Sequence, residues 1–102
     1  MRHFKVSGFQ WDEGNQEKCQ KHGVLVEIIE DLFVRSIVIL PDENHSNEEQ
    51  RFRAIGKTRE GRSVFVVFTL RRIDEEMFIR PISARYMHPK EVTAYETENP
   101  NL

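Results

Sequence analysis

Apolar residues are concentrated in the second half of the chain, where they form one long run. The seven residues from Val64 to Leu70 are rich in Val and Phe and follow a turn-forming Gly61. Such a run is typical of a strand buried on both faces of a sheet, because only a central strand hides every side chain. Turn-like residues at 73–76 follow, so Met77 to Arg85 is predicted to return as an antiparallel strand.

Helical patterns lie on both sides of the strand region. Asp12 is a suitable cap for a polar helix that ends before Gly23, since glycine readily adopts the left-handed conformation at a helix end. Residues 24–33 carry apolar side chains at helical spacing, which predicts an amphipathic second helix. A short last helix is predicted to begin at Pro89, because proline fits the first helical position.

Three shorter stretches complete the predicted sheet. They cover residues 3–9, 34–40 and 51–57. The resulting order is one strand, two helices, four strands and a helix. This is the α+β pattern of an antiparallel sheet with its helices on one face, so the other face is left partly open. Residues 1–102 are expected to form a single domain, because a chain of this length holds one modest core.

The strand from Met77 to Arg85 leaves its register open. Pro81 cannot donate a backbone hydrogen bond, so this strand either lies at an edge of the sheet or carries a bulge. Strict alternation places Arg80 and Arg85 on opposite faces. Only a bulge between them brings both to the same face.

The net charge of −2 conceals an uneven distribution. Residues 51–90 contain ten Lys/Arg and four Asp/Glu, whereas the remainder contains five and thirteen. A cationic sheet half suits a polyanion such as nucleic acid, although an unevenly charged, solvated surface explains the numbers equally well.

Several sequence features indicate a cytoplasmic protein without a membrane segment. The single cysteine excludes an internal disulfide, and no Cys/His pair has zinc-site spacing. Residues 1–5 lead into no apolar stretch, so we expect no signal peptide. No apolar run approaches the roughly 20 residues that a membrane helix requires.

Short motifs in a fixed order resemble the BrnT family of bacterial toxins. They include Gln10-Trp11-Asp12, Lys21-His22-Gly23-Val24, Ile55-Gly56, Gly61-Arg62, Phe65-Val66-Val67-Phe68-Thr69, Ile79-Arg80-Pro81-Ile82-Ser83-Ala84-Arg85 and Glu91 with Tyr95-Glu96. The resemblance implies a RelE-like fold, ribonuclease toxicity and a cognate BrnA-like antitoxin as partner. It also implies that operator DNA is contacted only through the antitoxin, with which the toxin represses its own operon. Gly14 in the first helix departs from the family pattern.

The catalytic candidates are three arginines and one histidine. RNA cleavage without a metal requires charge stabilisation at the phosphorane and proton transfer at the 2′- and 5′-oxygens. Arginine suits the first task because its forked donors match phosphoryl oxygens. Arg62, Arg80 and Arg85 are the candidates, and a structural ion pair is the alternative for each. His22 could donate a proton near neutral pH, or simply cap the end of its helix.

Further residues are candidates for RNA binding. Arg51 and Arg53 alternate onto one face and could extend a phosphate track, or pair with the acidic loop at 42–50. Tyr95 could stack on a base, although its place on an apolar stripe also fits core packing. The acidic loop contains metal-binding residue types but matches neither the EF-hand nor the zincin spacing, so we expect no metal and no cofactor.

Two functions of different classes follow from these observations. The first is a ribonuclease toxin that cleaves single-stranded RNA without a metal and so inhibits translation and growth. The second is a binding module with weak or absent catalysis, which acts as antitoxin partner and transcriptional co-repressor. Expression of the chain alone in bacteria separates them, because an active toxin arrests growth.

Overall fold

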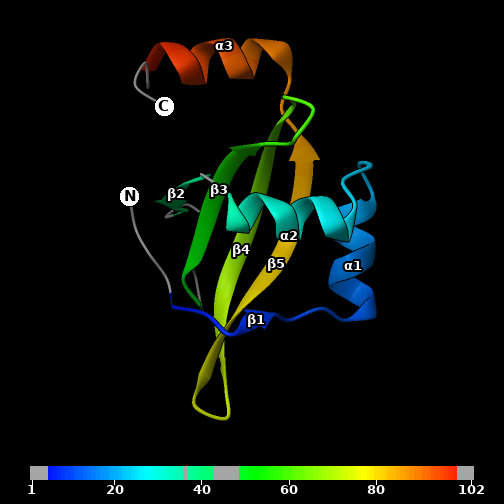
Figure 1. Ribbon diagram of the computed structural model, residues 1–102, viewed down its shortest axis with the longest axis vertical. Coiled ribbons are helices and arrows are strands. Elements are labelled where there is room, and N and C mark those ends of the chain that lie inside the picture. Colours follow the sequence, from blue (N-terminus) through cyan, green and yellow to red (C-terminus); the bar gives the residue numbers. More distant parts are fainter. Residues whose placement is uncertain (1–4, 36, 43–48, 99–102) are drawn as a thin grey trace.

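The described part of the chain folds into one five-stranded sheet with three helices (Figure 1). The computed structural model describes residues 5–35, 37–42 and 49–98. The strands are β1 (Gly8–Phe9), β2 (Ile37–Pro41), β3 (Arg51–Lys57), β4 (Ser63–Ile73) and β5 (Glu76–Tyr86). The helices are α1 (Glu13–Gln20), α2 (Val26–Val34) and α3 (Pro89–Glu98). The α+β class and the order of elements confirm the predictions.

The sheet is mixed, with strands in the order β1-β5-β4-β3-β2. Four strands pair antiparallel as predicted, but β1 pairs parallel with β5, which corrects the expectation of a wholly antiparallel sheet. The predicted first strand, residues 3–9, is reduced to Gly8–Phe9, and residues 3 and 4 lie outside the described residues. Because β1 covers its outer side, β5 is an interior strand.

A bulge in β5 decides the register that the sequence leaves open. The pairing of β4 with β5 shifts by one residue after Val67, so Ile82 has no partner in β4. Pro81, which lacks a backbone N–H, lies directly beside this irregularity. The partners of Arg80 and Arg85 in β4 are an even number of residues apart. The extra residue therefore brings both arginines to the same face of the sheet.

The helix ends follow the signals in the sequence. Asp12 caps α1 by accepting a hydrogen bond from the backbone N–H of Asn15 at 2.9 Å. Gly23 has a positive φ of 86° after the helix, and α3 begins at Pro89. None of the helices in the described ranges is long and apolar enough to cross a membrane.

The core lies between α2 and one face of the sheet. Ile29 and Leu32 of α2 are buried against that face. The ring of Phe68 lies edge-on to Phe33 of α2, with centroids 5.1 Å apart, and stacks on Phe52 of β3 at 5.4 Å. These aromatic contacts join α2 to the central strands.

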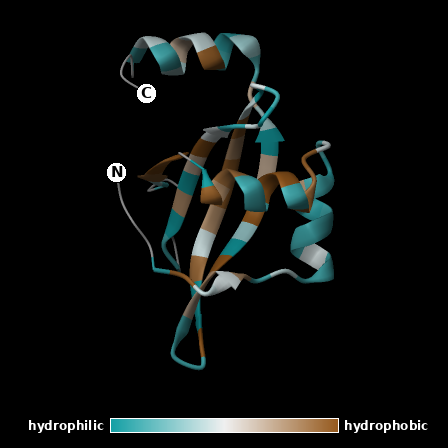
Figure 2. Cartoon of the chain, viewed as in Figure 1, coloured by the Kyte–Doolittle hydropathy of each residue, from teal (hydrophilic) through white to brown (hydrophobic). Residues whose placement is uncertain are grey.

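Strand β4 is central, as predicted, but it is buried mainly along one face, whereas on the other face Thr69 alone is fully buried. Val64 and Val66 are fully buried, whereas Phe65 and Val67 on the other face are half-buried. The expectation of burial on both faces is therefore wrong. Figure 2 shows the alternation along the strands, with α1 and α3 largely hydrophilic. Helix α2 lies across the buried face, α1 lies beside β5, and α3 lies beyond one end of the sheet (Figure 1).

Candidate nucleic-acid interface

The sheet face turned away from α1 and α2, which we call the open face, carries cations from three strands. They are Arg51, Arg53 and Lys57 of β3, Arg71 of β4, and Arg80 and Arg85 of β5. Between them lies a half-buried apolar floor of Ile55, Phe65, Val67 and Phe78. Six of the ten Lys/Arg in residues 51–90 thus lie on the predicted open face. The cations of the open face suit the charge of a polyanion, and its apolar floor suits the polyanion's rings.

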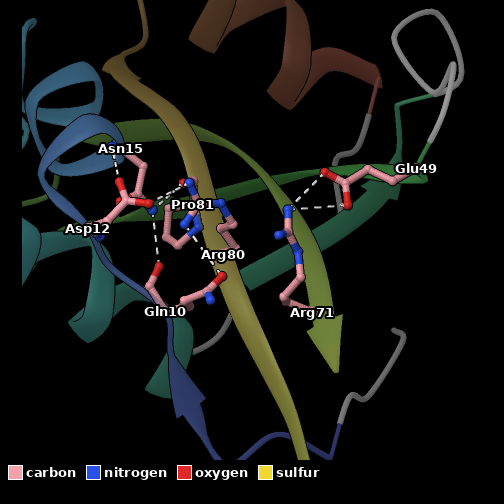
Figure 3. A network of polar contacts seen from close by, with 7 residues as sticks. All are labelled: Gln10, Asp12, Asn15, Glu49, Arg71, Arg80 and Pro81. Carbon is pink, nitrogen blue, oxygen red and sulfur yellow. Dashed lines mark hydrogen bonds and ion pairs between the residues drawn. The ribbon is translucent and has the colours of Figure 1, made fainter. Parts of the chain in front are cut away.

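Arg80 is engaged by the beginning of α1 (Figure 3). Its Nη2 lies 2.8 Å from Oδ2 of Asp12, and its Nη1 donates to Oε1 of Gln10 at 3.4 Å. The bond from the backbone N–H of Asn15, followed by Arg80, lowers the pKa of Asp12. The buried Asn15 amide also donates to the carbonyls of Gln10, at 3.0 Å, and Pro81, at 2.9 Å. Arg80 therefore helps to fix α1 against β5.

Arg85 forms a forked ion pair with α3. Its Nη1 and Nη2 donate to the two carboxylate oxygens of Glu91 at 2.7 and 2.9 Å. The pair raises the pKa of Arg85 and lowers the pKa of Glu91 to about 2. The Cζ atom of Arg85 lies 5.0 Å from the ring centroid of Phe65. A guanidinium group with both forks directed at oxygens, beside an aromatic ring, has the geometry that recognises a phosphate next to a base.

The remaining cations of the open face differ in how strongly they are paired. Arg71 lies 3.2 Å from Glu49 (Figure 3), and Lys57 lies 3.5 Å from Glu96. Among the described residues, Arg53, in the middle of the face, donates to the carbonyl of Pro41 at 3.4 Å and pairs with no carboxylate. Arg53 is therefore well placed to accept an external anion.

The structure does not bring Arg62 together with Arg80 and Arg85. The turn after β3 directs Arg62 toward α2, where its Cζ lies 3.5 Å above the ring of Tyr86 in a groove of about 380 Å³. His22 is exposed in the turn between α1 and α2, and no contact within the described ranges joins it to the open face. Of the four catalytic candidates, only the two arginines of β5 therefore lie together on the open face.

The other predicted residues lie in or beside the open face. Arg51 is half-buried in β3, on the same face as Arg53. Tyr95 lies half-buried on α3, and desolvation raises its pKa. No cluster of ligand residues among those the structure describes could hold a metal. Glu43, His45 and Glu48 of the acidic loop lie outside the described residues.

Sequence reasoning missed three residues of this face. Lys57 continues the alternation of Arg51 and Arg53 along β3, so the same periodicity could have identified it. Arg71 follows the apolar run at the corresponding spacing in β4. Phe65 was assigned to the core because the whole run from Val64 to Leu70 is apolar.

Most of the chain matches the sequence model of a known protein family. A family model described as the ribonuclease toxin BrnT of type II toxin–antitoxin systems matches residues 11–91. This range extends from the cap of α1 into the first turn of α3, so it includes every cation of the open face. The comparison with curated proteins gave no match.

Proposed function

The chain belongs to the BrnT family of ribonuclease toxins from type II toxin–antitoxin systems, and we propose that it cleaves single-stranded RNA on the open face of its sheet. One observation carries this assignment. The bulge at Ile82 and the alternation of β3 and β4 place cations of three neighbouring strands on one face, around half-buried apolar side chains. Such a face provides both backbone neutralisation and a platform for bases, which single-stranded nucleic acid requires.

The proposed reaction needs only the chain, the RNA and solvent water. The ribose 2′-hydroxyl gives its proton to water as its oxygen attacks the adjacent phosphorus, and the bond from phosphorus to the 5′-oxygen breaks as water protonates that oxygen. The products are a 2′,3′-cyclic phosphate and a free 5′-hydroxyl. Arg85 and Arg53 stabilise the negative charge that develops on the phosphoryl oxygens, with Arg51 extending the contact along the backbone.

Phe65 supplies the proposed base-binding element. It lies near the beginning of β4, opposite Arg85 on one side and Ile55 on the other. Its ring is half-buried and therefore both rigid and accessible. Stacking of a base on such a ring contributes about 1–3 kcal/mol and tolerates any base, since every base has a π face.

The other candidates take different parts in this proposal. Arg80 acts as a positioning residue, because its bonds to Asp12 and Gln10 hold the start of α1 against β5. Arg62 and His22 lie on the helix side and do not contribute to the RNA site. The cognate antitoxin is proposed to cover the open face, because masking the cations blocks RNA and provides partners for their charges.

The pairing of the cations favours a second candidate function. Lys57, Arg71, Arg80 and Arg85 each have a carboxylate partner in the same chain. Internal pairing of this extent weakens the attraction for phosphate. The alternative is therefore a binding module with little catalysis, which serves as antitoxin partner and co-repressor.

Expression of the chain without antitoxin, with matched arginine variants, tests the proposal. Growth arrest is expected for the unaltered chain and for Arg59→Gln, which removes a cation from the helix side, but not for Arg53→Gln. The purified chain should cleave single-stranded RNA in EDTA and leave 2′,3′-cyclic phosphate ends. Cleavage that disappears in EDTA contradicts the metal-free reaction. Equal toxicity of the two variants contradicts the placement of the site. Normal growth with the unaltered, folded chain supports the binding module.

A further inference from the structure

Helix α3 is attached to the open face mainly by charge, with Val92 and Tyr95 half-buried beside the ion pairs. None of its residues is buried. Glu91 accepts hydrogen bonds from both forks of Arg85, at 2.7 and 2.9 Å, and Glu96 lies 3.5 Å from Nζ of Lys57. Arg85 and Lys57 both belong to the open face. The helix therefore holds two of the cations that the proposed RNA site would use.

The helix can be released from this position without loss of the core. The side chains of Arg85 and Glu91 are 42% and 41% exposed, and those of Lys57 and Glu96 are 58% and 54% exposed. Solvent-exposed pairs of this kind contribute little to stability and are weakened by salt. The backbone N–H of Met87 still donates to β4 at 2.9 Å, so the sheet remains paired up to the start of the helix.

The carboxylates of α3 pair with these cations in the way that a phosphate would. Arg85 presents two parallel N–H donors to the oxygens of Glu91, which is the arrangement that guanidinium groups also form with phosphate. Glu91 stays ionised because Arg85 holds its pKa far below the usual range. An RNA phosphate can reach Arg85 in the same orientation only if Glu91 leaves.

We propose that α3 is an autoinhibitory acidic strap, whose carboxylates at Glu91 and Glu96 are displaced from Arg85 and Lys57 when RNA binds the open face. This inference rests on the proposed function. The exchange replaces one anion with another at each cation, so RNA affinity is set by competition between the strap and the phosphates. The strap leaves the middle of the face, around Arg53, accessible for the first contact.

Charge-neutral variants of the helix test the strap. Glu91→Gln and Glu96→Gln remove one negative charge each, and Gln at position 91 can still accept the hydrogen bond from the N–H of His88 that begins the helix. Glu98→Gln is the matched control, because it removes the same charge from a residue with no ion pair in the described part of the chain. The probe is a fluorescein-labelled, 2′-O-methylated oligouridylate of about ten nucleotides, which cannot be cleaved.

Each of the two strap variants is expected to bind the probe about two- to fivefold more tightly than the unaltered chain, as expected for loss of one exposed ion pair. The gain should shrink at about 0.5 M salt, where such pairs are screened. Unchanged or weaker binding overturns the strap, and so does an equal gain in Glu98→Gln. If the unaltered chain binds RNA but the strap variants gain nothing, the proposed function stands and only the strap fails. Failure of every variant to bind RNA overturns both.

Hydrogen exchange gives a second test that does not depend on substitution. Addition of the same oligouridylate to the unaltered chain should speed amide exchange in α3, residues 89–98, and slow it in β3 and β5. Slower exchange in α3 on RNA binding would show that the helix closes over the RNA, and the strap would be overturned.

Discussion

Replacement of Asn15 with alanine should strongly destabilise the fold. The side chain accepts a bond from the N–H of Asp12 at 2.7 Å and donates to the carbonyls of Gln10 and Pro81 at 3.0 and 2.9 Å. Each such bond contributes about 1 kcal/mol, and the buried carbonyl of Pro81 would lose its partner. The expected cost is therefore about 3 kcal/mol, which lowers the melting temperature of a domain of this size by roughly 15 °C.

Urea denaturation of Asn15→Ala and of Gln16→Ala provides the measurement. Gln16 is the exposed neighbour in the same helix and should tolerate the change with little loss. The midpoint of Asn15→Ala should shift strongly at unchanged m-value. A loss below about 1 kcal/mol, or an equal loss in both variants, would refute the view that this network holds α1 against β5.

Three further predictions concern the core and the charges. Gly56→Ala should lower the free energy of unfolding by about 1–3 kcal/mol, because the new Cβ would lie 2.7 Å from Cγ2 of Ile37; an unchanged urea midpoint would contradict this close approach. Burial raises the pKa of Cys19 to about 11, so a disulfide reagent at pH 8 should label it only after unfolding, and prompt labelling of the native chain would contradict that burial. The pKa of Glu91 falls from 4.5 to about 2 through its pair with Arg85. Its stabilising contribution is thus complete above pH 4.5 and disappears as the pH falls through 2. A carboxyl NMR titration should give a midpoint near 2 that moves up in Arg85→Met, and a midpoint near 4.5 in the unaltered chain would exclude the pair.

The sequence predicts the elements of this fold well because their signals are local. The cap at Asp12, the positive φ at Gly23 and the apolar run of β4 each depend on neighbouring residues only. The first strand was the exception. Its two paired residues are too few for a periodic pattern, and its parallel pairing joins Gly8 to Phe78 in β5, far away in the sequence.

The candidate site was predictable only where strand alternation holds. Arg51 and Arg53 share a face through simple periodicity. Arg80 and Arg85 share that face only because of the bulge, which Pro81 suggested but did not decide. The ion pair between Arg80 and Asp12 joins residues 68 positions apart, and the orientation of Arg62 depends on a turn and on the position of α2. Neither has a local signature.

An NMR titration with uncleavable RNA tests most directly whether the open face is the binding surface. The account predicts that the backbone amides of β3, β4 and β5 and the side-chain signals of Arg53 and Phe65 shift on addition of the oligonucleotide, whereas Arg59 and Tyr86 on the helix side do not. Shifts concentrated at Arg59 and Tyr86, with the open face unchanged, would contradict it.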